Sequence, residues 1–244
     1  MMRVACFAVG CTMLSGALAG DFGVSPIRLD LDRSTRSAVL TVTNDDAKPL
    51  TFQVRALQWT QDADGADRYA DTTDLVYFPQ QLKIPPKESR VIRVGVKVPA
   101  LQAEKAYRLF IEELADPSAR DPAQSGVAIT LRFGVPVFLR PPAERRAGDM
   151  QLLAAAGAAR ALVRNTGNVH FRIASVRFAG LGAAGETLFE QSIDGWYLLS
   201  GAERAYTLAL PPDLCRTVRV LHAEAVAEKL SVRAERALGP EDCR

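Results

Sequence analysis

Residues 126–140 read GVAITLRFGVPVFLR, and every odd position from Val127 to Leu139 is apolar. Successive side chains of a β-strand point to opposite faces, so the odd positions would form one continuous apolar row. The run from Gly126 to Leu139 is 14 residues long, whereas a common strand has about five to six. We therefore expect a strand that extends beyond its own sheet. The simpler alternative is a core strand packed wholly inside its own domain.

Two features of this run favour an edge strand that pairs with a strand of another chain. Pro136 has no N–H to donate, and prolines in sheets are found mainly on edge strands. Between Val127 and Val137 the only charged residue is Arg132, although soluble proteins normally protect an apolar edge with charges. An unprotected edge is typical of β-augmentation, in which main-chain hydrogen bonds provide affinity and alternate side chains fill pockets.

Segments rich in β-branched and aromatic residues recur through the first half of the chain, separated by Gly, Pro and Asp. This density predicts an antiparallel sandwich of about seven strands. The polar segment Gln61–Asp67 is expected to be a hairpin turn; a calcium loop is the alternative, but Gly65 is misplaced for an EF-hand. The other expected strands are Phe22–Leu31, Val39–Thr43, Leu50–Trp59, Val91–Val98 and Tyr107–Leu114.

Residues 140–148 read RPPAERRAG and break the strand pattern with two prolines and a cluster of charges. Such a segment is typical of a domain boundary. We expect a leader over 1–19, a first domain over 20–141, a linker over 142–148 and a second, smaller β-domain over 149–244. The candidate strands of the second domain are Leu152–Ala155, Ala161–Arg164, Phe171–Phe178, Thr187–Gln191, Tyr206–Leu210, Thr217–Leu221 and Leu230–Ala234.

The first residues have the pattern of a secretory signal peptide. Arg3 precedes the apolar run Val4–Leu14, and Ala17-Leu18-Ala19 offers the small residues that signal peptidase accepts. Cleavage after Ala19 would leave an exported chain that begins at Gly20. An uncleaved membrane anchor is the alternative, but the apolar stretch is shorter than a typical span.

Export would remove two of the four cysteines and leave Cys215 and Cys243 in an oxidising compartment. One disulfide near the C-terminus is therefore expected. Two unpaired thiols are the alternative.

Composition argues against several functional classes. The 30 basic residues against 28 acidic ones leave a net charge of +2, which is too little for a dedicated nucleic-acid binder. The two histidines, His170 and His222, cannot supply a multi-histidine metal site, and no serine has a Gly-x-Ser-x-Gly context. We therefore expect neither an enzyme nor a protein that needs a metal or cofactor.

Five short segments of the first half recur in a known family. They are Val24-Ser25-Pro26 with Arg28, Thr43-Asn44-Asp45, Ile84-Pro85-Pro86 before Val91-Ile92-Arg93-Val94, Glu104–Leu114 and Val135–Pro141. Through them the chain resembles the PapD-like periplasmic chaperones of the chaperone–usher pilus pathway, and the last two segments are most similar to the archaic branch. The second half is similar mainly through Val163–Asn168 and the terminal cysteine.

The resemblance implies two immunoglobulin-like domains in a boomerang arrangement, located in the periplasm and not inserted in the membrane. Chaperones of this family lend a strand to pilus (fimbrial) subunits that lack one, deliver them to an outer-membrane usher and need no nucleotide. The strand that runs from Val127 corresponds to the donor. Its expected pocket-filling residues are Val127, Ile129, Leu131, Phe133 and Val135.

Well-studied members of the family also hold the terminal carboxylate of the subunit with an Arg and a Lys. Arg28 matches the Arg, whereas Pro136 takes the position of the Lys. Arg108 and Arg132 are the candidate substitutes, because a guanidinium can bind a carboxylate through two parallel hydrogen bonds. For each arginine the alternative is a solvated side chain on a strand face.

One rival function comes from a different class. A secreted two-domain β-sandwich could bind carbohydrate or a cell surface, with Trp196 and Tyr197 as a platform for a sugar ring.

Overall fold

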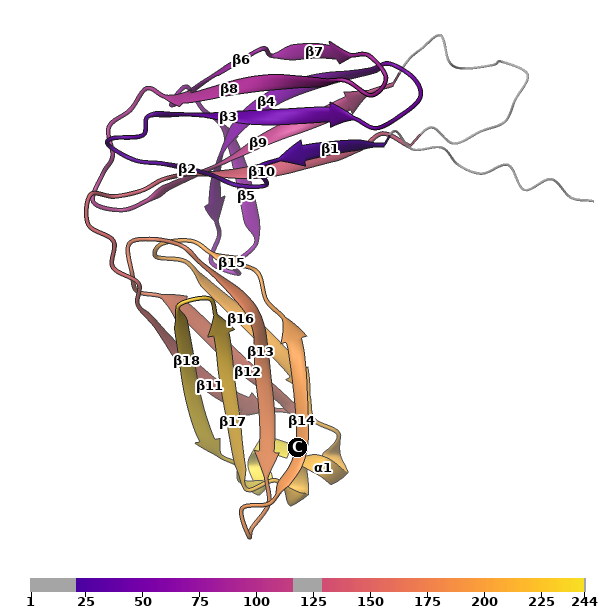
Figure 1. Cartoon of the computed structure of the whole chain (residues 1–244). Helices are drawn as coiled ribbons and strands as arrows, with labels where there is room; N and C mark the ends of the chain where they lie inside the picture. The colour runs from indigo at the N-terminus through magenta and orange to yellow at the C-terminus, as the bar shows by residue number, and fades with distance from the viewer. Residues whose placement is uncertain (1–20, 116–128, 244) are drawn as a thin grey trace, which may run out of the picture.

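The computed structural model describes residues 21–115 and 129–243, and these residues are mostly β-strand. The strands form two sandwiches, one in each half of the chain, which meet at one end and lie at an angle to each other (Figure 1). The expected all-β fold with two domains in a bent arrangement is confirmed. In the described ranges, no helix is long and apolar enough to cross a membrane.

The first sandwich consists of two sheets that bury one core between them. One sheet has the strand order β1-β3-β8-β6, and the other has the order β2-β10-β9-β4-β5, with β7 also paired to β4. Leu40, Phe52, Ile92 and Leu109 are among the fully buried side chains that the two sheets contribute. The strands are β1 (Phe22–Ser25), β2 (Leu29–Leu31), β3 (Ser37–Asn44), β4 (Leu50–Gln61), β5 (Asp67–Asp71), β6 (Leu75–Phe78), β7 (Gln81–Ile84), β8 (Ser89–Val96), β9 (Lys105–Leu114) and β10 (Arg132–Leu139).

Strand β10 is shorter than the sequence predicts. It spans eight residues, and the expected strand started at Gly126. Residues Gly126–Ala128 lie outside the described residues, and Ile129–Leu131 are not in a strand. Strand β9 continues to Leu114, and the amide of Glu113 donates to the carbonyl of Leu131 at 2.9 Å, so the two segments stay adjacent for one residue beyond the paired part.

The second sandwich packs the sheet β11-β12-β16 against the sheet β14-β13-β17-β18, and β15 pairs with β13. Thr217, which the sequence placed at the start of a strand, instead ends helix α1. Pro212 favours this helix because proline suits its first turn and cannot donate a ladder bond. The elements are β11 (Gly148–Ala155), β12 (Ala158–Asn165), β13 (Phe171–Leu181), β14 (Thr187–Asp194), β15 (Tyr197–Leu198), β16 (Glu203–Ala209), α1 (Pro212–Thr217), β17 (Val220–Ala227), β18 (Leu230–Ala237) and the 3₁₀-helix η2 (Pro240–Cys243).

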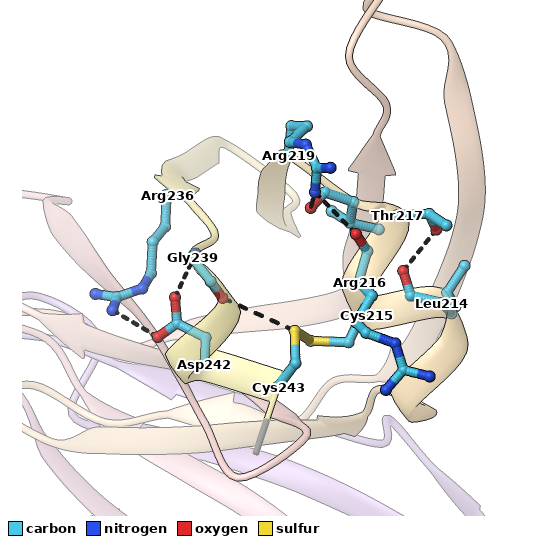
Figure 2. Close-up of a disulfide and its surroundings, with 10 residues drawn as sticks. Leu214, Cys215, Arg216, Thr217, Arg219, Arg236, Gly239, Asp242 and Cys243 are labelled. Atoms are coloured by element: carbon cyan, nitrogen blue, oxygen red, sulfur yellow. Dashed lines mark hydrogen bonds and ion pairs between the residues drawn. A yellow bond between two sulfur atoms is a disulfide. The ribbon is translucent and has the colours of Figure 1, made fainter.

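A disulfide between Cys215 and Cys243 ties α1 to η2 (Figure 2). The two Cα atoms are 5.7 Å apart, and 28 positions separate the residues in sequence. Beside the bridge, the carboxylate of Asp242 accepts hydrogen bonds from the Gly239 amide and from Arg236 (Figure 2). The end of the chain is therefore fixed to the second sandwich by a covalent bond and by a buried carboxylate.

A small apolar cluster joins the two sandwiches. The ring of Phe138, a member of this cluster, stacks on the imidazole of His170, with ring centroids 3.6 Å apart. The imidazole Nδ1 lies 2.7 Å from a carboxylate oxygen of Glu104, so a residue of the second domain is held by two of the first. The members of the cluster are Trp59, Ala106 and Phe138 of the first domain and Leu199 of the second, with Tyr197 and Ala202 packed against them.

Candidate functional site

The apolar row predicted along β10 divides into a buried part and an exposed part. Val137 and Leu139 are fully buried in the core of the first sandwich. Ile129, Leu131 and Phe133 are 44%, 39% and 38% exposed. Three large apolar side chains at alternate positions therefore face solvent beside the strand that continues into the core.

The same segment has main-chain groups that no described strand uses. One side of β10 pairs with β9 along its whole length. The other side pairs with β2 only over Val137–Leu139. Residues 132–136 thus form an edge that is unpaired by any described strand, directly next to the exposed apolar residues. An edge of this kind is a template for the strand of another chain.

The opposite edge of this sheet shows how the chain protects an edge that it does not use. Strand β5 is only five residues long, and three of them are Asp67, Arg68 and Asp71. Short strands and charged side chains are the usual means of preventing edge-to-edge pairing. The edge at β10 lacks this protection over most of its length, since its one charge is Arg132.

Val135 and Val127, two of the predicted pocket-filling residues, are not part of the exposed row. Val135 is 0% exposed and pairs with Leu109 in the middle of the sheet, so its side chain lies in the core of its own domain. The expectation that Val135 fills a pocket of another protein is wrong for this structure. Val127 lies outside the described residues. The exposed part of the row is therefore Ile129–Phe133.

The three candidate arginines differ in their partners. Arg28 Nε lies 2.9 Å from a carboxylate oxygen of Asp30. Arg132 Nε lies 2.7 Å from a carboxylate oxygen of Glu112. Arg108, which is 7% exposed, forms no ion pair with any residue that the structure describes.

Arg108 lies on the face of β9 that points away from the core of its own sandwich. The odd neighbours Tyr107 and Leu109 belong to that core, whereas Ala106 belongs to the cluster between the domains. One guanidinium nitrogen of Arg108, Nη1, donates to the carbonyl of Gly134 at 3.0 Å. Its Nε and Nη2 are buried and have no hydrogen-bond partner among the described residues. A buried cation with two unused donors is costly and favours an anionic ligand.

Three aromatic rings surround this guanidinium, and we call them the aromatic cage. The Cζ atom of Arg108 is 4.0 Å from the ring centroid of Trp59, 5.6 Å from that of Tyr197 and 5.7 Å from that of Trp196. The negative faces of such rings stabilise a cation in part. Tyr197 and Trp196 come from the second domain, so both domains build the surroundings of Arg108.

A second arginine and two further rings continue this face of the sheet. Arg132 Cζ lies 3.7 Å from the ring centroid of Phe110, and Tyr69 meets Phe110 edge-on at 5.3 Å. Burial raises the pKa of Tyr69, the nearby Asp67 carboxylate adds to the rise, and Arg108 opposes it. The Tyr69 hydroxyl is therefore a protonated donor at neutral pH, and it donates to Asp67 at 3.3 Å.

Sequence reasoning missed the aromatic cage. Trp59 belongs to none of the motifs found in the sequence, and it is 1% exposed. The available signal was Arg108 itself, which lies between Ala106 and Phe110 on one strand face. The sugar platform expected as an alternative does not form a flat surface, because the rings of Trp196 and Tyr197 are nearly perpendicular, with an interplanar angle of 88°.

Comparison with known proteins identifies the family of the chain. Residues 21–144 match the family described as "Pili and flagellar-assembly chaperone, PapD N-terminal domain". The chain belongs to this family.

Its curated relatives include proteins of Escherichia coli named "Probable fimbrial chaperone". EcpB is 28% identical over 198 residues, which are 80% of this chain and 83% of EcpB. LpfB is 26% identical over 136 residues, 55% of this chain, and the match spans only 56% of the length of LpfB.

Solved chaperones have the same fold at low sequence identity. The chaperone of the CsuC–CsuE pre-assembly complex, from archaic Csu pili of Acinetobacter baumannii, has a TM-score of 0.62 at 16% identity, covering 87% of this chain and 98% of that one. The chaperone YadV has a TM-score of 0.60 at 14% identity, covering 89% and 100%. The complex of the SafA pilin with the SafB chaperone of Salmonella enterica has a TM-score of 0.56 at 13% identity, covering 90% and 98%.

Proposed function

We propose that this chaperone binds an incomplete fibre subunit by adding the segment Ile129–Phe133 and the free edge of β10 to the sheet of the subunit. The observation that carries the proposal is the division of one apolar row into a buried part and an exposed part beside an unpaired edge. This arrangement supports donation, because a strand used only inside its own sandwich would be buried throughout. Two of the structural neighbours are complexes of a chaperone with a pilin or a tip adhesion subunit.

Burial of apolar surface would drive this binding. Moving a large apolar side chain from water into a pocket contributes about 1.5–3 kcal/mol, and three such side chains line the segment. Main-chain hydrogen bonds along Arg132–Val135 would add geometric specificity. The subunit gains as well, since its exposed groove would otherwise promote aggregation. No nucleotide is needed when folding of the subunit supplies the free energy.

Arg108 is our choice for the group that binds the terminal carboxylate of the subunit. Arg28 and Arg132 already have carboxylate partners at 2.9 Å and 2.7 Å. Arg108 has two unused buried donors and lies on the strand that pairs directly with β10. A carboxylate would satisfy both donors at once, and this bidentate geometry is the strong form of the arginine–carboxylate interaction.

The proposal also includes a location in the periplasm and a second partner, an outer-membrane usher. A signal peptide over residues 1–19 and the Cys215–Cys243 disulfide both favour the oxidising periplasm. Delivery of the bound subunit to an outer-membrane usher is proposed on the basis of the family alone.

The test is capture of a subunit in the periplasm. The full chain is co-expressed with a candidate pilus subunit, and the amount that co-purifies is measured for Leu131→Asp and Phe133→Asp. The matched control is Val91→Asp, because Val91 is 48% exposed on the other sheet of the same sandwich. We expect both β10 variants to lose capture while they stay folded by circular dichroism.

Normal capture by folded Leu131→Asp and Phe133→Asp would overturn the proposal. Equal loss of capture in Val91→Asp would also count against it, since the effect would then not depend on the free edge.

A further inference from the structure

Arg108 is closed off in the chain as it stands. Its unused Nε and Nη2 are both buried. Two of the three cage rings cannot easily move away: Trp59 is 1% exposed, and Tyr197 packs against the apolar cluster between the domains. Trp196 is 38% exposed and is the only cage ring with a large free surface. Of the three cage rings, Trp196 is therefore the one that a ligand could displace on its way to the buried donors.

The main chain around Trp196 is held in place by the first domain. The β4–β5 hairpin extends from the first sandwich to the second (Figure 1). The side-chain amide of Gln61 donates to the carbonyl of Tyr197 at 2.8 Å, and its oxygen accepts from the amide of Leu199 at 2.9 Å. The backbone that follows Trp196 is thus fixed like a paired strand, and the indole side chain is the part left to move.

The tip of the hairpin adds a tight contact. Gly65 has a φ of +74°, and a Cβ atom there would lie 2.7 Å from the carbonyl oxygen of Glu203. Arg204 Nη1 donates to the carbonyl of Gly65 at 3.2 Å. Glycine permits this backbone approach, which stabilises the hairpin against the second domain.

The indole itself is held by a single polar contact. Trp196 Nε1 donates to one carboxylate oxygen of Asp67 at 3.0 Å. The other oxygen of Asp67 accepts from Gln61 Nε2 at 3.0 Å, so the carboxylate is oriented by the same residue that fixes the backbone. Both oxygens of Asp67 are therefore occupied, and the carboxylate is not paired with Arg108.

We propose that Trp196 is a gate over Arg108, latched by Asp67, and that the gate must open before a carboxylate binds. This inference rests on the proposed role of Arg108 as the carboxylate-binding residue. When the gate opens, the indole gives up its contact with Asp67 and leaves the face of the guanidinium, and the carboxylate takes its place. The latch thereby keeps stray anions from the site until a ligand is held nearby by its other contacts.

The state of the latch can be measured without any ligand. The chain has two tryptophans, and Trp59 is shielded, so quenching of fluorescence by acrylamide reports on Trp196. We expect a quenching constant about twofold to threefold higher in Asp67→Ala than in wild type, because the indole loses the hydrogen bond to a charged group that holds it in place. Asp71→Ala is the matched control, since this carboxylate lies at the other end of β5 and is 93% exposed. Equal quenching in wild type and Asp67→Ala would overturn the gate.

The effect on anion binding is measured separately at Arg108. The Nε–H resonance of Arg108, identified by its loss in Arg108→Met, is followed by NMR during titration with sodium acetate at constant ionic strength. Trp196→Phe keeps an apolar ring and removes the latch without changing charge. We expect acetate to bind about tenfold more tightly to Trp196→Phe, which corresponds to one hydrogen bond to a charged group.

The two outcomes are distinguishable from each other. If acetate does not perturb Arg108 in any variant while Asp67→Ala raises quenching, the latch exists and the carboxylate-binding role of Arg108 is wrong. If acetate binds to Arg108 equally in wild type and Trp196→Phe, the gate is wrong and the binding role stands.

Discussion

Asn44 and Asn165 have the same hydrogen-bonding role in the two sandwiches. Each is the last residue of a strand, β3 or β12, and each is at most 1% exposed. In both, the side-chain amide donates to main-chain carbonyls and the side-chain oxygen accepts from the amide two residues ahead. The partners are Lys48, Ile84, Pro85 and Asp46 for Asn44, and Val169, Leu198 and Gly167 for Asn165.

Replacing either asparagine with alanine should destabilise the domain that contains it. The change leaves at least two buried carbonyls without a donor, and each unsatisfied group costs about 1–3 kcal/mol. We expect Asn44→Ala and Asn165→Ala each to lower the free energy of unfolding by about 3 kcal/mol, measured by urea denaturation. Thr60→Ala, at an exposed position of β4, is the control and should change little. A loss below about 1 kcal/mol in both variants would contradict this account.

Arg108→Met should separate stability from function. The wild-type guanidinium is buried with two unused donors, and an apolar side chain of similar volume avoids that cost. We expect the free energy of unfolding of Arg108→Met to equal or exceed that of wild type, while capture of a subunit falls at least about tenfold. Thermal unfolding and co-purification measure the two quantities.

Arg132→Met is the comparison for this prediction. Arg132 is half exposed and paired with Glu112, so its loss should change stability by less than about 1 kcal/mol. If Arg108→Met is much less stable than Arg132→Met, the Arg108 side chain is a structural element of the first domain and the prediction fails.

Removal of the disulfide should weaken the second domain only. The bridge closes a segment with a sequence separation of 28, and a loop of this size corresponds to about 3.6 kcal/mol in chain-entropy models. We expect the double variant Cys215→Ala/Cys243→Ala to unfold at lower urea concentration in its second domain, as followed by hydrogen exchange. Exchange in the strands of the first domain should stay as in wild type. Faster exchange in β9 or β10 would contradict the prediction.

Acid should destabilise the second domain through Glu224. Hydrogen bonds from Ser231 and then from Arg233 lower the pKa of Glu224 to about 2, from an ordinary value of 4.5. Because the folded-state pKa is depressed, the stabilisation is present above pH 4.5 and is lost as the pH falls toward 2. The carboxylate accepts from Ser231 at 2.6 Å, from Arg233 at 2.8 Å and from Arg177 at 2.8 Å.

We expect Glu224→Gln to lose about 1 kcal/mol at neutral pH, a modest value because solvent screens the site. Its stability should also depend less on pH between 4.5 and 2 than that of wild type. Urea denaturation across this pH range measures both effects, with Glu235→Gln as the control on the neighbouring strand. Parallel pH profiles for wild type and Glu224→Gln would contradict the prediction.

Local pattern was enough to predict much of the fold. Alternation of apolar residues identified β3, β4, β8 and most strands of the second domain, because these strands bury one face. Strand β9 was identified by its run of apolar and aromatic residues, since it is buried on both faces. The strands β5, β6 and β7 were missed, since they are only four or five residues long. Strands this short are held by their neighbours and have too few residues to show a period.

The candidate site was predictable only where it depends on one strand. Pro136 and the scarcity of charge indicated an edge, but how far the core reaches along the apolar row depends on the packing of the two sheets, and Val135 lies inside that core. The selection of Arg108 over Arg28 and Arg132 depends on which arginine has a carboxylate nearby in space. The aromatic cage depends on a contact between domains, from positions about 90 residues apart in the chain.

The short parallel pairing of β2 with Val137–Leu139 sets a limit on any guest strand. A strand added to this edge cannot slide past Pro136 toward the C-terminus, because β2 already occupies the next main-chain groups. The register between β10 and an added strand is therefore limited at one end by the position of β2. Guests with different sequences would begin from the same position, and their side chains would meet Leu131 and Phe133 at a constant offset.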